Sequence, residues 1–371
     1  MFFEILHKEK DSLARNGVLT TKRGKVYTPV FMPVGTAGAV RALPPDRLSG
    51  LGAQIILGNT YHLFLRPGTE IIKTFGSLHR FIGWDKPILT DSGGFQIFSI
   101  RGNKKITDNG VEFKSHIDGS TFFLSPEDVV EVQNVLDSDI QMVLDYFAGN
   151  PSTRLDDEES LRLTHLWARR ARERFMQTNA GNAQFAIVQG GLQEDLRAES
   201  VETLAAMDFD GYAVGGLSVG ESQEDFRRII FFTAPRLPET KPHYLMGSGT
   251  PEEILLAVEL GIDMFDCVLP TRVARNGLLF TSRGRLSIKN QRYKQDKEPP
   301  DPGCQCYTCT NFSRAYLRHL YISGEINAAI LNSIHNIHFY LDFMCKIRYA
   351  IQLNKFSEFR EQFLLNYKEG V

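Results

Sequence analysis

The chain has 371 residues, a formal net charge of −2, and 42% hydrophobic and 23% charged residues, which is ordinary for a globular enzyme. No apolar run approaches the roughly 20 residues that a membrane span needs. The N-terminus becomes charged too early for a signal peptide, so we expect a cytoplasmic protein with no membrane partner. The five cysteines are an odd number and partly clustered, which argues against a disulfide framework and for a metal site.

Short apolar runs recur along the chain, and most are followed by a helix-like stretch. Ser125 and Thr250 each precede a proline and two acids, which is a helix-start signal. Residues 154–177 form a long amphipathic pattern. The runs are too short for helices and lack clean alternation, so they predict strands buried on both faces. They are FMPVG (31–35), QIILGN (54–59), PILTD (87–91), IQMVLD (140–145), FAIVQG (185–190), GYAVGG (211–216), HYLMG (243–247) and IDMFD (262–266).

Eight strand–helix units predict an α/β protein with a (β/α)8 TIM barrel. A doubly wound open sheet is the alternative, although no GxGxxG or Walker loop follows any run. In a barrel, the carboxyl ends of the strands line the active site. Three acids and an amide at equivalent strand ends favour chemistry over packing. These ends carry Asp91, Asp145, Gln189, Gly216, Met246 and Asp266.

Asp91 and Asp266 are the candidate catalytic carboxylates. Asp91 is followed by two glycines that let the backbone approach a ligand, and Phe95 then offers a flat face for stacking. Asp266 is followed by Arg272 and Arg275, which suits a carboxylate nucleophile beside a phosphate-bearing substrate. The plain alternatives are a tight turn for the first segment and an Asp–Arg ion pair for the second.

Two further segments, AIVQGG and GYAVGGLSVGE, resemble ligand cradles. The Gln189 amide can donate and accept hydrogen bonds at once, which suits a purine edge. Gly216 frees a backbone N–H to point at a carbonyl oxygen. Loop flexibility is the alternative explanation for the glycines.

A cysteine cluster, Cys304-x-Cys306-x-x-Cys309, predicts a structural zinc ion. Spacing alone leaves His319, His335 and His338 as candidates for the fourth ligand. The segment before the cluster is rich in cations with one tyrosine among them, which favours a phosphate backbone as partner; a solvated loop is the alternative. The candidate contacts there are Arg283, Arg285, Lys289 and Arg292.

The motifs together resemble those of the bacterial tRNA-guanine transglycosylases. The resemblance covers residues 28–340 and rests on NTYHLFLRPG, LTDSGGFQIFS, VQGGL, GGLSVGE, YLMGSGTPEE and DMFDCVLPTR...RNG. It implies a (β/α)8 barrel with an inserted zinc-binding subdomain, usually in a homodimer. It also implies exchange of guanine at the wobble position of a tRNA anticodon loop for a 7-deazaguanine base.

The resemblance also implies roles for individual residues. Asp266 becomes the nucleophile and Asp91 the general acid/base. Retention by two displacements implies carboxylates roughly 5 Å apart and a raised pKa for one of them. By the same resemblance, the base is recognised by Asp145, Gln189 and Gly216, and Leu217 contributes through its backbone. The zinc ligands are Cys304, Cys306, Cys309 and His335.

One departure from the family pattern lies beside the base-reading aspartate. The bacterial pattern continues with Glu-Cys and a proline-rich turn, whereas this chain has Tyr146-Phe147-Ala148-Gly149. We therefore expect an altered pocket that admits the bulkier base queuine as well as 7-aminomethyl-7-deazaguanine. Phe95 stands where a tyrosine is also common.

We expect a barrel domain over 1–280, a zinc-binding, tRNA-contacting subdomain over 281–340, and a C-terminal helix over 341–371 that packs on the barrel. Two rival functions share these features. A glycoside hydrolase would use the same two acids but needs neither the basic segment nor the metal. A non-catalytic tRNA-binding subunit would tolerate loss of the acids, yet both are present.

Overall fold

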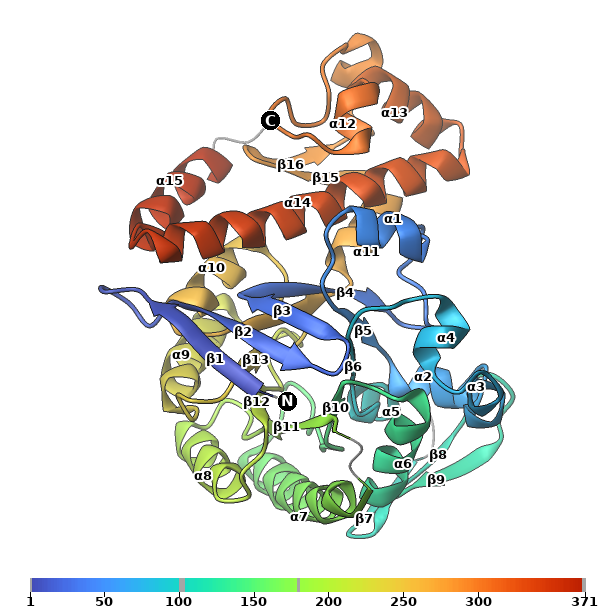
Figure 1. Ribbon diagram of the computed structural model, residues 1–371, viewed down its shortest axis with the longest axis vertical. Coiled ribbons are helices and arrows are strands. Elements are labelled where there is room, and N and C mark those ends of the chain that lie inside the picture. The colour runs from blue at the N-terminus through green and yellow to red at the C-terminus, as the bar shows by residue number, and fades with distance from the viewer. Residues whose placement is uncertain (1, 100–103, 179–180, 369–371) are drawn as a thin grey trace.

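The computed structural model describes residues 2–99, 104–178 and 181–368 and has a closed barrel of eight parallel strands (Figure 1). Neighbours in the barrel follow chain order, and the last strand pairs with the first. Each strand falls on one of the eight predicted apolar runs, so the barrel is confirmed and the open sheet is excluded. The strands are β4 (Val30–Gly35), β5 (Ile56–Gly58), β6 (Ile88–Thr90), β10 (Ile140–Met142), β11 (Ala183–Val188), β12 (Gly211–Val214), β13 (His243–Leu245) and β14 (Met264–Cys267).

Helices connect the barrel strands and surround them. Ser125 and Thr250 form capping boxes at the starts of α6 and α10, as their sequence signals predicted. The connecting helices are α1 (Pro45–Gly50), α2 (Thr60–Leu65), α3 (Thr69–Phe75), α4 (Leu78–Ile82), α5 (Gly94–Ser99), α6 (Pro126–Leu136), α7 (Arg154–Thr178), α8 (Glu194–Ala205), α9 (Gln223–Thr233), η1 (Ala234–Arg236), α10 (Pro251–Glu259) and α11 (Leu269–Arg275).

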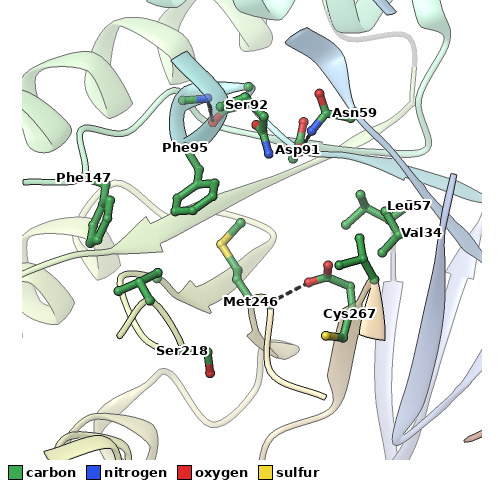
Figure 2. Close-up of a pocket in the computed structure, with 18 of the residues that line it drawn as sticks. Val34, Leu57, Asn59, Asp91, Ser92, Phe95, Phe147, Ser218, Met246 and Cys267 are labelled. Atoms are coloured by element: carbon green, nitrogen blue, oxygen red, sulfur yellow. Dashed lines mark hydrogen bonds between the residues drawn. The ribbon is translucent and has the colours of Figure 1, made fainter. Parts of the chain in front are cut away.

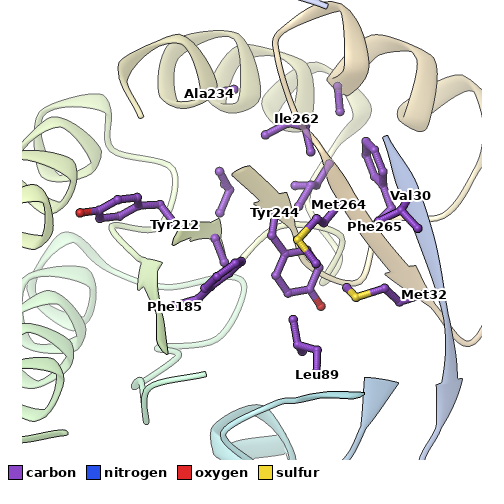
Figure 3. Close-up of a cluster of buried hydrophobic side chains, with 14 of the residues drawn as sticks. Val30, Met32, Leu89, Phe185, Tyr212, Ala234, Tyr244, Ile262, Met264 and Phe265 are labelled. Atoms are coloured by element: carbon purple, nitrogen blue, oxygen red, sulfur yellow. The ribbon is translucent and has the colours of Figure 1, made fainter. Parts of the chain in front are cut away.

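Apolar side chains fill the barrel interior. Met32, Phe185, Tyr244 and Met264 come from four different strands and are all fully buried, and Figure 3 shows the ring of Tyr244 lying among the other three, with Leu89 nearby. A barrel filled in this way is a packed core and not a pore. A ligand can therefore reach it only at one of its two ends.

A three-stranded antiparallel sheet that the sequence analysis did not foresee is tied to the amino ends of the barrel strands. It comprises β1 (Phe2–Lys8), β2 (Arg15–Thr21) and β3 (Gly24–Thr28). Arg15 forms a buried ion pair of 2.6 Å with Asp263, just before β14. Arg23 pairs with Asp139, just before β10. These contacts close the amino end and leave the carboxyl end for a site.

A second sheet, also missed, is inserted between β6 and β10. It consists of β7 (Lys104–Thr107), β8 (Gly110–Lys114) and β9 (Thr121–Leu124). Phe113 packs in a cluster with Trp167 of α7, whose indole N–H donates to the Asp108 carbonyl at 3.0 Å. The Asp108-Asn109-Gly110 turn was an available hairpin signal.

The C-terminal region is a smaller unit held to the barrel by one long helix, α14 (Ile326–Gln352) (Figure 1). The Asn336 side chain donates to the carbonyls of Pro270 and Leu278 at 2.9 and 3.1 Å and accepts from the Phe280 N–H. The unit's other elements are β15 (Leu278–Thr281), β16 (Gly284–Ser287), η2 (Gln291–Gln295), α12 (Tyr307–Asn311), α13 (Arg314–Ile322) and α15 (Phe356–Lys368).

The helix α14 continues unbroken across residues 340–341, so the boundary expected there falls inside one element. The division into units stays a proposal. Among the described residues, no helix is both long enough and apolar enough to cross a membrane.

Candidate active site

A cavity of about 510 Å³ opens at the carboxyl end of the barrel, within the size range of small-molecule sites. The structure brings most of the predicted site residues to its wall, from strands far apart in sequence. Those that line it are Asp91, Phe95, Asp145, Gln189, Gly216, Leu217, Met246, Asp266 and Arg272. The other predicted RNA-contacting residues, Arg275, Arg283, Arg285, Lys289 and Arg292, are not among its lining residues.

Asp91 follows β6, and both of its carboxylate oxygens are held. Oδ1 accepts the Thr60 backbone N–H at 2.9 Å, and Oδ2 accepts the Asn59 side-chain amide. Burial raises the pKa of Asp91, the Thr60 hydrogen bond opposes that rise, and the nearby carboxylates of Asp266 and Asp145 add to it, so that the pKa lies at about 7. This carboxyl can therefore give up or take a proton near neutral pH.

Asp266 lies on β14 and its two hydrogen bonds both go to one oxygen. Oδ1 accepts the Tyr244 hydroxyl at 2.5 Å and the Gly247 N–H at 2.8 Å. Among the described residues, Oδ2 has no hydrogen-bond partner, and the residue lines the cavity. Burial raises the pKa of Asp266, while the two donors oppose that rise. Donors of this kind stabilise the ionised form, which is the nucleophilic one.

Asp145 and Gln189 form a buried polar pair on the cavity wall. The Gln189 amide donates to Asp145 Oδ2 at 2.7 Å, and the Ser92 hydroxyl donates to Oδ1 at 3.2 Å. Because the amide nitrogen carries two hydrogens, one remains for a ligand. Burial raises the pKa of Asp145, and these two bonds oppose the rise. The pair offers an acceptor and a donor side by side to the edge of a flat heterocycle.

Two aromatic rings border the same cavity. Phe95 is 47% exposed although it is apolar, and its ring centroid lies 5.8 Å from that of Phe147. Figure 2 shows both rings facing the cavity, with Met246 beside Phe95 and Asp91 next to Asn59. An exposed ring at a cavity mouth is suited to stacking on a planar ligand.

The predicted RNA-contacting cations lie on α11 and on the C-terminal unit. Arg275 donates to the Thr271 carbonyl at 2.9 Å. The Lys289 ammonium lies 5.2 Å from the Tyr321 ring centre, and the Arg292 guanidinium lies 4.7 Å from that of Tyr293. Arg283 and Arg285 are exposed.

The predicted metal ligands meet in one cluster. Ligand atoms of Cys304, Cys306, Cys309 and His335 all lie within 4.8 Å of one another. His335 turns Nδ1 toward the three sulfurs, while its Nε2 lies 2.6 Å from the Phe280 carbonyl. A carbonyl partner on the second nitrogen is the usual way to orient a metal-binding histidine. The cluster can bind a metal ion. His338 Nδ1 also approaches Cys304, at 3.5 Å.

Three residues that hold the carboxylates were not identified from the sequence. Asn59 and Ser92 follow strand ends, so their positions at the barrel mouth could have pointed to them. Tyr244 lies inside the run HYLMG, and its spacing is that of a core residue. Its hydrogen bond to Asp266 crosses from β13 to the neighbouring strand β14, which no local pattern reports.

Asp91 generates a prediction about stability and pH. The folded protein holds the Asp91 proton up to about pH 7, whereas an unconstrained aspartate loses it near 3.8. As the pH rises from 3.8 to about 7, the free energy of unfolding of the wild type therefore falls, because the unfolded state releases the Asp91 proton at a lower pH than the folded state does. Asp91→Asn removes this loss.

We expect the difference in unfolding free energy, variant minus wild type, to grow between about pH 4 and pH 7 and to stay constant above. Urea unfolding at several pH values measures it. The exposed Asp85→Asn serves as the control. A difference that does not change with pH would contradict the burial of an ionisable Asp91.

Comparison with known proteins identifies the family. A family model described as "Queuine tRNA-ribosyltransferase" matches residues 10–369. Curated proteins of that name are similar over nearly their whole length. The one from Neisseria gonorrhoeae (strain ATCC 700825 / FA 1090) is 55% identical over 366 residues, covering 99% of this chain and 98% of the relative.

Relatives from other organisms agree. The Thermodesulfovibrio yellowstonii protein is 53% identical over 364 residues, covering 98% of this chain and 94% of its own. The Dechloromonas aromatica protein is 52% identical over 370 residues, covering all of both chains. The predicted resemblance is thereby confirmed: the chain belongs to the queuine tRNA-ribosyltransferase family of pentosyltransferases.

Proposed function

We propose that this enzyme exchanges guanine at the wobble position of a tRNA anticodon loop for a 7-deazaguanine base by double displacement. The observation that carries the proposal is that Asp91 and Asp266 line one cavity with different hydrogen-bond environments. Such an asymmetric pair suits one acid/base and one nucleophile. The base leaves the RNA stack to enter the cavity, as enzymes acting on bases require.

In the first displacement, Asp266 Oδ2 attacks C1′ of the ribose. The bond from C1′ to guanine breaks, its electron pair goes to the base, and protonated Asp91 supplies the proton that neutralises it. A covalent aspartyl–ribose intermediate remains. In the second displacement, Asp91 takes the corresponding proton from the incoming base, whose nitrogen attacks C1′ and releases Asp266. Two inversions retain the configuration, as in retaining glycosidases.

The base is recognised by other residues that line the same cavity. Asp145 accepts from the donor edge of guanine, and the Gln189 amide and the Gly216 N–H donate to its carbonyl oxygen. Leu217 contributes through its backbone. Adenine presents the reverse pattern and is rejected, because it would leave buried polar groups unpaired.

The cations on α11 and the C-terminal unit are the proposed contacts to RNA phosphates. Arg272 lines the cavity, and Arg275 follows it one turn later on the same short helix. Their position supports contact with phosphates flanking the extruded nucleotide. Such contacts weaken steeply with salt, which a glycoside hydrolase acting on neutral sugars would not show.

The metal is proposed to be zinc, held by Cys304, Cys306, Cys309 and His335. Three thiolates and one imidazole within 4.8 Å match a closed, structural site. When bound, the ion would cross-link these four residues. It would have no open coordination position for chemistry. It would fasten α12 to α14, and α14 in turn holds the start of α11 through Asn336. Assembly as a homodimer stays a prediction.

Replacing the proposed nucleophile separates chemistry from binding. We expect Asp266→Asn to lower base exchange by roughly 10⁴-fold or more while tRNA affinity stays within a few-fold, because the phosphate contacts remain. Exchange of labelled guanine and filter binding measure the two quantities. Wild type should also form a tRNA adduct that survives denaturation, and the variant should not.

The exposed Asp46→Asn is the matched control and should keep full activity. Exchange by Asp266→Asn at the wild-type rate would reject the assigned nucleophile. Wild-type protein that binds tRNA but exchanges no base would favour the non-catalytic binding subunit.

Removal of the metal tests the structural site. We expect one zinc ion per chain by mass spectrometry, and its loss in Cys309→Ser should destabilise the C-terminal unit by an amount on the order of 10 kcal/mol. Cys345→Ser, at an exposed thiol on the same long helix, is the control. Equal thermal melting of both variants, or metal-free wild type with full stability, would refute the site.

The choice of incoming base tests what the departure from the family pattern at Phe147 does. We expect incorporation of queuine as well as the aminomethyl base, since Phe147 gives the 7-substituent an apolar wall. Phe147→Ala should lower kcat/KM for queuine by about 2- to 10-fold more than for the smaller base, the scale of one aromatic contact. Phe123→Ala, on the inserted sheet, is the control. A strong wild-type preference for the aminomethyl base would reject this expectation.

A further inference from the structure

Arg197 is a fully buried arginine directly behind the cavity wall. It lies in the first turn of α8, which begins at Glu194. Its Nη1 donates to the carbonyls of Val188 and Gly215 at 2.9 and 2.8 Å, and its Nε donates to Gly191 at 3.0 Å. One guanidinium thus joins the end of β11, the end of β12 and the turn after β11.

Two of the three carbonyls that Arg197 binds belong to residues that directly precede the base-reading residues in the chain. Val188 is followed by Gln189, and Gly215 by Gly216. A Cβ built on Gly216 would lie 2.6 Å from the Gln189 Oε1 and 3.4 Å from the Arg197 Nη2. The space there is therefore filled by the guanidinium and the amide. Any movement of Arg197 changes where both donors to the base are held.

The charge of Arg197 is also unusual. Burial lowers its pKa to about 10, against the pull of Asp157 and Glu221, so it stays cationic at neutral pH. Within the described part of the chain, no carboxylate lies within ion-pair distance, and Nη2 has no hydrogen-bond partner. The buried Arg15 differs, because Asp263 neutralises it. A buried cation with no carboxylate in direct ion-pair contact costs stability, which indicates a use beyond packing.

We propose that Arg197 is a positioning residue for the base exchange: it fixes Gln189 and Gly216 at the spacing of the base and places positive charge behind their donors. As the bond from C1′ to the base breaks, electron density moves onto the base and its carbonyl oxygen. A fixed positive charge behind the donors stabilises that density more than it stabilises the neutral bound base. This inference rests on the proposed function.

The test compares Arg197→Lys and Arg197→Met with Arg15→Lys. Arg15 is the matched control, being 4% exposed and bonded to carbonyls and an aspartate at the opposite end of the barrel. We expect Arg197→Met to lower kcat/KM for the incoming base by roughly 100-fold, the effect of a misplacement of about 1 Å. The Kd for tRNA should stay within a few-fold. Arg197→Lys should recover more of kcat than of KM for the base, because it restores the charge but not the fork of donors.

Arg15→Lys should lower the melting temperature and leave the base kinetics as in wild type. Folded Arg197→Lys with wild-type kcat and base KM would overturn the inference, and so would an equal loss in Arg15→Lys. If Arg197→Met does not fold, Arg197→Lys decides.

Calorimetric binding of free guanine gives a second readout that needs no turnover. If the wild type exchanges no base, the proposed function fails; weaker guanine binding by Arg197→Lys than by Arg15→Lys would still support the positioning role, and equal binding would overturn it.

Discussion

The pairing of β14 with β4 closes the barrel, and the rest of the site depends on that closure. The register sets Asp266 opposite Met32, so the last strand of the barrel stands beside the first. Asp91, at the end of β6, then shares a cavity with a residue 175 positions later in the chain. All strands of a parallel barrel run in the same direction, so their carboxyl ends all lie at the same mouth of the barrel. The sheet β1–β3 is bonded to Asp263 and Asp139 at the amino end of the barrel. A ligand therefore has access at the carboxyl end.

Three carboxylates within one cavity would repel each other if all were ionised, and their surroundings resolve the conflict. Burial raises the pKa of all three. Asp91 rises to about 7, because nearby acids add to burial. Each of the three carboxylates accepts two hydrogen bonds: Asp91 and Asp145 on both of their oxygens, and Asp266 on Oδ1 alone. Asp266 therefore keeps one oxygen without a hydrogen-bond partner among the described residues, whereas both oxygens of Asp91 are held. The proposed roles of nucleophile and acid/base rest on this difference, which the fold supplies.

The barrel strands were predicted from local sequence, whereas the two additional sheets were missed, although the Asp108-Asn109-Gly110 turn carried a local signal for one of them. Each barrel strand lies on an apolar run that ends in a small or polar residue, a pattern visible without a structure. The strands of the sheets β1–β3 and β7–β9 mix polar and apolar residues, and the second sheet packs through contacts such as Phe113 with Trp167. The same division holds in the site. Asp91, Asp145 and Asp266 stand at or after strand ends and were found by position, whereas Tyr244 and Arg197 act through partners on neighbouring strands, which the chain brings near only when the sheet forms.

The helix α14 connects the metal-ligand cluster to the segments that border the cavity. That helix carries His335, and it also carries Asn332, Asn336 and Tyr340, which are all buried. Asn332 donates to the Ala274 carbonyl at 3.2 Å, on the helix of Arg272 and Arg275, and the Tyr340 hydroxyl donates to the Gly249 carbonyl near the Asp266 loop. A metal ion that joined His335 to the three sulfurs would restrain the rotation and sliding of α14, and these three side chains would pass that restraint to the segments after β13 and β14. An ion remote from the reacting atoms can thus contribute to their placement without any part in the bond changes.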